Sequence, residues 1–203
     1  MALDPVMNPY TPGAGQTPAV LSGREDELRD FEARLQRLEL GRSAQCTLIV
    51  GLRGVGKTVL LNRFAAQAIA RDWVVVEHEL NAKADLLVTI ARLSRQALLE
   101  LAPPSSLQRA GHTVAGLLRS FEISYSLGGL GVSLPAAGEA RHERPASGDP
   151  ARDLTDLLVA LGEAASEHDR GVAFLFDELQ FAAAEPLGAF VAGMHKVAQR
   201  ALP

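Results

Sequence analysis

The chain has 203 residues, of which 47% are hydrophobic and 22% charged, enough for one globular domain with a core of its own. Its net charge of −4 excludes a global basic field that would attract nucleic acid or an anionic membrane. A lone cysteine, Cys46, excludes an internal disulfide, and no apolar run approaches the ~20 residues of a membrane span. We therefore expect a cytoplasmic protein.

Residues 1–20 are rich in proline and glycine, which predicts an extended leader before a domain that covers 21–203. The leader lacks the basic and apolar parts of a secretory signal. From Arg24 onward, apolar residues at helical spacing predict an amphipathic helix that ends near Gly41. The run CTLIV (46–50) then predicts a buried strand, with Cys46 buried at its start.

A glycine-rich loop (51–56) follows, and a helical pattern begins at Lys57. WVVVEHEL (73–80) predicts a second strand, and residues 83–102 predict a helix that Pro103 and Pro104 end. A short helix is expected over 106–121. Residues 122–134 alternate across Gly128-Gly129 as a β-hairpin does, and 135–150 have the composition of a linker, so an insertion and linker are expected at about 122–150.

Asp149 and Pro150 suit the N-cap and first turn of the next helix, whose leucines recur at helical spacing. GVAFLFDELQF (171–181) predicts a third buried strand that runs into two carboxylates, and a last helix follows. Strands that alternate with helices indicate an α/β fold with a mainly parallel sheet.

The loop matches the phosphate-binding pattern G-x-x-x-x-G-K-[ST]. Glycines allow backbone N–H groups to converge on phosphate oxygens, and the following helix adds the positive end of its dipole. Lys57 is expected to bridge the β- and γ-phosphates, and the Thr58 hydroxyl to ligate Mg²⁺. Only three lysines occur among twenty basic residues, and one lies in this loop. The expected nucleotide ligands are Gly51, Leu52, Arg53, Gly54, Val55, Gly56, Lys57 and Thr58.

The second candidate feature is the pair Asp177–Glu178 at the end of the third strand. Open α/β sheets bind ligands at the carboxyl ends of their strands. We expect Asp177 to hold Mg²⁺, directly or through water, and Glu178 to polarise the water that attacks the γ-phosphate. The expected cofactors are thus ATP and Mg²⁺, with Glu178 and Lys57 as the catalytic residues.

These motifs resemble the P-loop ATPases with an additional strand and a catalytic glutamate. VLSGREDEL (20–28) is similar to the entry motif of origin-recognition-like AAA ATPases and of STAND signalling ATPases. The resemblance implies a three-layer αβα sandwich, and it implies that Gly23 and Arg24 lie near the adenine end of the site. It rests on residues 20–58 and 171–181, and between them it is architectural only.

The resemblance also implies elements that do not follow Glu178 in this sequence. In the family order 5-1-4-3-2, the fourth strand lies between the strand that leads into the loop and the strand that bears the acidic pair. Without it, those two strands are separated by about two spacings of ~4.8 Å and have unpaired backbone groups. We therefore expect a partial core, truncated after its third strand, that belongs to a longer protein. We expect this chain to bind nucleotide, and we expect hydrolysis in the full-length protein.

Three other classes of P-loop protein bear comparison with an AAA-like ATPase. A STAND-type scaffold, in which ATP controls assembly and hydrolysis is slow, shares the same motifs. A P-loop kinase is a weaker alternative, and a GTPase lacks its guanine motif, since NAKAD (81–85) has the wrong spacing. The five histidines show no metal-ligand spacing. A homo-oligomer is compatible with the resemblance, while DNA and an effector protein remain equally open as partners.

Overall fold

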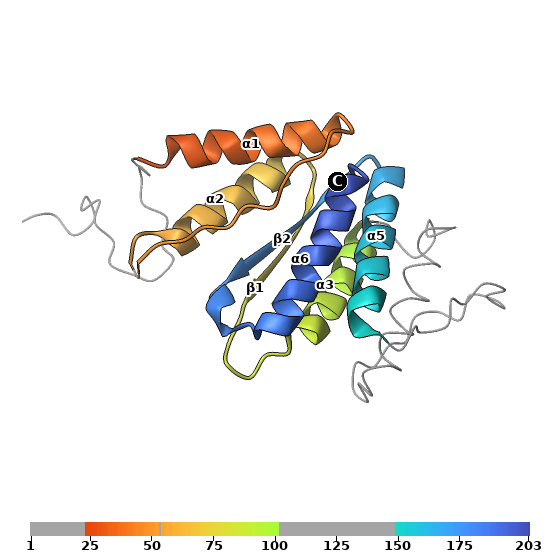
Figure 1. The fold of residues 1–203 in the computed structure, drawn as a ribbon. Helices are drawn as coiled ribbons and strands as arrows, with labels where there is room; N and C mark the ends of the chain where they lie inside the picture. The colour runs from red at the N-terminus through yellow and green to blue at the C-terminus, as the bar shows by residue number, and fades with distance from the viewer. Residues whose placement is uncertain (1–22, 53, 102–148) are drawn as a thin grey trace, which may run out of the picture.

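The computed structural model describes residues 23–52, 54–101 and 149–203. Figure 1 shows the elements in these ranges, which are, in chain order, α1 (Glu25–Glu39), α2 (Lys57–Ala70), β1 (Val74–Glu79), α3 (Leu86–Leu101), α5 (Pro150–Glu167), β2 (Val172–Asp177), the 3-10 helix η1 (Leu179–Phe181) and α6 (Ala184–Gln199). The expected leader, the helix over 106–121, the hairpin and all but the end of the linker lie outside the described residues.

β1 and β2 form a parallel two-stranded sheet, in which Val74 pairs with Val172 and Glu79 with Asp177. Parallel neighbours need a crossover connection, and α3 and α5 lie in the chain between the two strands. The mixed α/β fold and the parallel pairing are confirmed. The third predicted strand is shorter than expected, because β2 ends at Asp177 and η1 follows.

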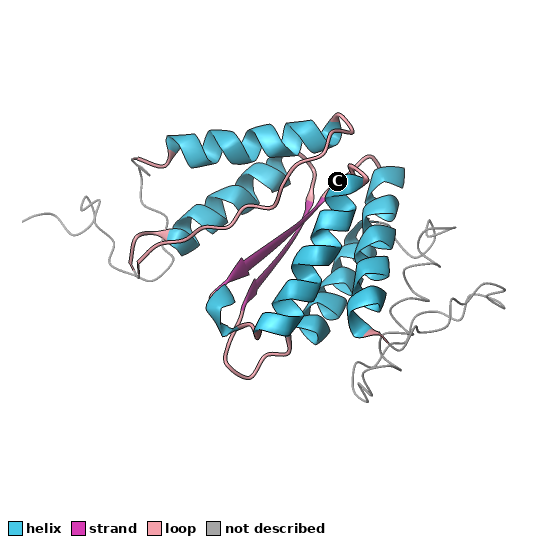
Figure 2. Ribbon diagram, viewed as in Figure 1, coloured by secondary structure: helices cyan, strands magenta, loops and turns pink. Residues whose placement is uncertain are grey.

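Helices cover both faces of this sheet (Figure 2). Successive residues of a strand point to opposite faces. Val74 and Val76 therefore pack with α3, α5 and α6, while Val75 packs with α1 and α2. On β2 the same alternation places Leu175 on the α2 side. Asp177, two residues further, belongs to that same face.

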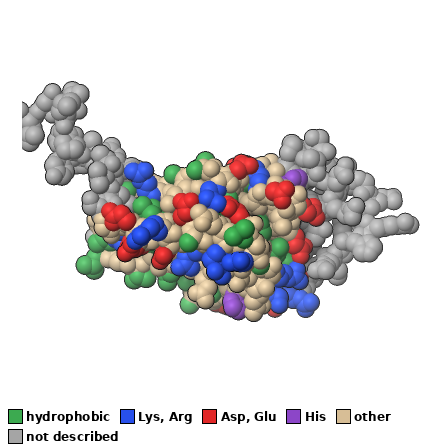
Figure 3. Space-filling model, turned by 90° about the horizontal axis from the view of Figure 1, so that it is seen from above, with side chains coloured by type: hydrophobic (Ala, Val, Ile, Leu, Met, Phe, Trp, Pro, Cys, Tyr) green, Lys and Arg blue, Asp and Glu red, His purple; other side chains and the backbone are tan. Residues whose placement is uncertain are grey.

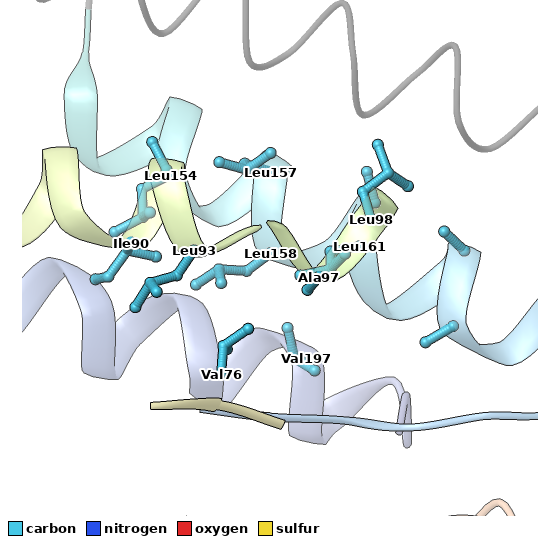
Figure 4. Close-up of a cluster of buried hydrophobic side chains, with 14 of the residues drawn as sticks. Val76, Ile90, Leu93, Ala97, Leu98, Leu154, Leu157, Leu158, Leu161 and Val197 are labelled. Carbon is cyan, nitrogen blue, oxygen red and sulfur yellow. The ribbon is translucent and has the colours of Figure 1, made fainter. Parts of the chain in front are cut away.

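The largest cluster of buried side chains lies on the α3 side of the sheet. Figure 4 shows leucines of α5 beside Ile90, Leu93 and Leu98 of α3, with Val76 and Val197 below them. The α5 leucines recur at helical spacing, which gives the helix one apolar face (Leu154, Leu157, Leu158 and Leu161). The predicted cap is confirmed, since the Asp149 carboxylate accepts hydrogen bonds from Ala151 N at 3.0 Å and Arg152 N at 3.4 Å.

The prediction of a buried strand at 46–50 is wrong for this structure. Within the described ranges, the sheet has two strands and residues 46–50 belong to neither of them. Leu48 is 72% exposed and Val50 85% exposed, and Cys46, expected to be buried, is exposed as well. Ile49 alone is half-buried, against the α2 cluster. An apolar, β-branched run needs a hydrogen-bonded neighbour to form a strand, and none of the described segments pairs with it.

Candidate functional site

The glycine-rich loop leads directly into α2, as the sequence predicts. Gly56 is the N-cap residue with φ 83°, and Gly54 has φ 82°. These left-handed backbone angles favour glycine, which explains the fixed glycine at position 56 and the additional glycine at position 54. The first turn of α2 carries no acidic residue, so nothing in that turn offsets the positive end of the helix dipole or its free N–H groups.

Lys57 is folded over the loop that precedes it. Its ammonium nitrogen donates hydrogen bonds to the carbonyl oxygens of Gly51 at 3.0 Å and Leu52 at 2.9 Å. The ammonium therefore lies at the start of the loop, held by two neutral acceptors. A phosphate is a stronger acceptor than a carbonyl for an ammonium, because the hydrogen bond is then charge-assisted on both sides.

The two motifs meet at Thr58 and Asp177, which are 119 positions apart in the chain. The Thr58 hydroxyl donates to Asp177 Oδ2 at 2.6 Å. This contact is possible because α2 packs on β2, where Phe64 and Leu175 belong to the same buried cluster. A hydroxyl and a carboxylate are the hard oxygen ligands that Mg²⁺ prefers, and the two predicted metal ligands lie together. The donor set therefore fits a magnesium ion.

Glu178 has a backbone conformation unusual for its residue type. With φ 55° and ψ 37° it lies in the left-handed region and caps η1. Its backbone N–H donates to Asp177 Oδ1 at 2.8 Å, so both oxygens of Asp177 accept a hydrogen bond. The Glu178 carboxylate accepts a hydrogen bond from the Gln180 side-chain amide. The adjacent carboxylates thus have different partners, and each is about half-buried.

Arg24 also reaches the loop. One guanidinium nitrogen donates to the carbonyl oxygen of Val55 at 3.1 Å, and the other donates to Glu27 Oε1 at 2.6 Å. The bond from Arg24 holds the pKa of the Glu27 carboxyl below its ordinary value of 4.5. Gly23, with φ 79°, lies next to this arginine, so both residues of the entry motif lie near the loop. Arg53 lies outside the described residues.

Two residues at this site were missed by the sequence analysis. Glu27 could have been found, because it lies three positions after Arg24 at a helix start, where such pairs face each other. Gln180 gave no signal beyond its place in DELQ, since its role depends on the turn that η1 makes after β2. The described residues contain no group of three or more His, Cys, Asp or Glu side chains that could hold a metal ion.

The outer surface around α1 carries acidic and basic side chains side by side (Figure 3). Ion pairs account for part of this pattern, including Arg24 with Glu27 and Arg29 with Asp26. None of the helices in the described ranges has the length and the apolar character needed to cross a membrane.

Comparison with known proteins adds one finding to this geometry. A family model described as AAA ATPase domain matches residues 20–203, which is more than nine tenths of the chain. The match covers the entry motif, the glycine-rich loop and the acidic pair. No curated protein and no solved structure matches the chain.

Proposed function

The chain belongs to the AAA ATPase domain family, which implies that it binds ATP, and we propose that it binds Mg-ATP on residues 51–58 and supports hydrolysis through Glu178. The observation that carries this proposal is the bond between Thr58 and Asp177 at 2.6 Å. It joins the end of the phosphate loop to the end of β2, where the chemistry requires both ligands of one metal ion.

Each side chain has a role in this proposal. The backbone N–H groups at the start of α2 bind the phosphates, and Lys57 exchanges its two carbonyl partners for the β- and γ-phosphate oxygens. Thr58 and Asp177 hold Mg²⁺, which would offset negative charge on the phosphate oxygens when bound. The Glu178 carboxylate accepts a proton from the attacking water.

We also propose how the described elements correspond to a P-loop sandwich. β1 and β2 are its second and third core strands. The position of α2 on β2 supports this assignment, because it already sets the loop beside Asp177.

Two substitutions separate binding from turnover. Lys57→Ala is expected to abolish ATP binding measured by calorimetry, because the loop loses its only ammonium. Glu178→Gln is expected to keep binding and to lower turnover about 100-fold or more, since an amide cannot act as the base. Turnover is measured as phosphate release by the full chain. If Glu178→Gln hydrolyses ATP at the wild-type rate, the role assigned to Glu178 is wrong.

One observation favours the alternative of a nucleotide-switched scaffold of the STAND type with slow hydrolysis. The Gln180 amide occupies one oxygen of Glu178, so this oxygen is not free to accept a proton from water until the hydrogen bond breaks. On this alternative, Gln180→Ala raises the turnover rate while leaving ATP affinity unchanged. If Gln180→Ala turns over at the wild-type rate or more slowly, the bond does not restrain the base.

A further inference from the structure

We infer that Arg24, oriented by Glu27, is a positioning residue that fixes one peptide group of the phosphate loop. The inference rests on the proposed function and adds a role for a side chain that lies outside the loop. The geometry that carries it is a chain of two hydrogen bonds, from Arg24 to Glu27 Oε1 at 2.6 Å and from Arg24 to the Val55 carbonyl at 3.1 Å.

The contacted peptide group joins Val55 to Gly56, and its neighbours give it freedom to rotate. Gly54 and Gly56, on either side of Val55, both have left-handed backbone angles, with φ 82° and 83°. Glycine populates positive and negative φ with similar ease, so a peptide group next to it can flip at low cost. Without an external contact, the Val55 carbonyl could turn toward the space that phosphate oxygens occupy.

Arg24 opposes this flip through the planarity of the peptide bond. In a trans peptide the carbonyl oxygen and the following N–H point in opposite directions. A guanidinium that binds the Val55 carbonyl therefore fixes the direction of the Gly56 N–H on the other side of the loop. Gly56 is the N-cap residue of α2, so its N–H belongs to the set of donors available to an anion.

The guanidinium can do this because α1 is anchored along α2. Phe31 stacks on Phe64 with ring centroids 4.1 Å apart and an interplanar angle of 13°. Further along, the Gln67 amide donates to the Leu28 carbonyl oxygen at 3.2 Å. Arg71, after the end of α2, pairs with Glu32 and Glu39. Figure 1 shows α2 beneath α1, with the two helices at an angle to each other.

Glu27 restricts the guanidinium at its other end. Arginine has several donors in a rigid fork, so one guanidinium can bind a carboxylate and a carbonyl together. The Arg24 side chain is 29% exposed and the Glu27 side chain 40% exposed, so water competes for both only in part. A lysine at position 24 has one nitrogen and a flexible stem, and it could not hold both partners in the same planar arrangement.

A role in positioning the loop and a direct contact with adenine predict different effects of Arg24 on ligand binding. If Arg24 acts on the loop, its loss weakens binding of every ligand that uses the phosphate site, with or without a base. Inorganic tripolyphosphate is the probe without a base. Arg24→Ala is expected to weaken the binding of ATP and of tripolyphosphate by the same factor, about tenfold, as for the loss of a hydrogen bond from a charged donor.

The experiment measures both affinities by calorimetry in the full chain. Arg29→Ala is the matched control, because Arg29 lies in α1, pairs with Asp26 three positions away and makes no bond to the described residues of the loop. Its affinities are expected to equal those of the wild type. Arg24→Lys and Glu27→Gln are expected to weaken both ligands about threefold, because each keeps part of the arrangement. If Arg24→Ala does not fold, Arg24→Lys and Glu27→Gln test the inference in its place.

A loss confined to ATP overturns the inference, because it assigns Arg24 to the base. Unchanged affinity for both ligands in Arg24→Ala and Glu27→Gln overturns it as well. Lys57→Ala keeps this result distinct from a failure of the proposed function. If Lys57→Ala loses both ligands and Arg24→Ala loses neither, only the positioning role fails. If the folded wild type binds neither ATP nor tripolyphosphate, the proposed function itself is wrong.

Discussion

Gly171→Ala tests the packing between the sheet and α1. A methyl group added at Gly171 would lie 2.3–2.5 Å from three ring atoms of Trp73, far inside the ~3.5–4.0 Å of an ordinary carbon contact. The ring has little room to withdraw, because Trp73 is 5% exposed and its indole N–H donates to Glu39 Oε1 at 3.1 Å. Overpacking of a core typically costs ~1–3 kcal/mol, and we expect the upper end here.

Urea unfolding followed by tryptophan fluorescence measures this cost directly, since Trp73 is the only tryptophan in the chain. The matched control is Gly188→Ala. Gly188 lies in α6 with no atom within 4 Å of the added methyl group, so the substitution is expected to stabilise the chain by roughly 0.5–1 kcal/mol. A change of less than ~0.5 kcal/mol for Gly171→Ala would refute the packing described here.

Two further predictions concern the metal ligands and the α1–α2 contact. Thr58→Val keeps the side-chain shape but removes the hydroxyl that bonds Asp177. Calorimetry should therefore show an ATP affinity that is reduced about tenfold in the presence of Mg²⁺ and unchanged in EDTA. An equal loss of affinity in both conditions would contradict the metal role of Thr58. Hydrogen bonds from Arg71, and secondarily from Trp73, hold the pKa of Glu39 below its ordinary value of 4.5, against the opposing effect of partial burial. The stabilisation is therefore complete above pH ~4.5 and is lost as the pH falls through the lowered pKa, so unfolding free energies should depend less on pH in this range for Arg71→Gln than for the wild type.

Local signals in the sequence predicted much of the fold. The spacing of leucines identified α3 and α5, and the Asp149-Pro150 pair located the start of α5 correctly. The phosphate-loop pattern placed the start of α2 at Lys57. These features depend on residues that are close in the chain, so periodicity and capping rules suffice to find them.

Features that depend on distant partners were harder to predict. CTLIV has the composition of a strand, but residues 46–50 pair with no described segment and are mostly exposed, so composition alone gave the wrong result. The contact of Arg24 with Val55 spans 31 positions and follows from how α1 lies on α2. A motif indicates which residues take part, whereas the packing of whole helices decides which atoms meet.

Calorimetric titration of the folded chain with Mg-ATP, repeated with Lys57→Ala, tests the central claim most directly. We predict saturable uptake of the nucleotide by the wild type and its loss in the variant. Absence of uptake by folded wild-type protein, or equal uptake by both, would contradict the assignment of residues 51–58 as the ATP site.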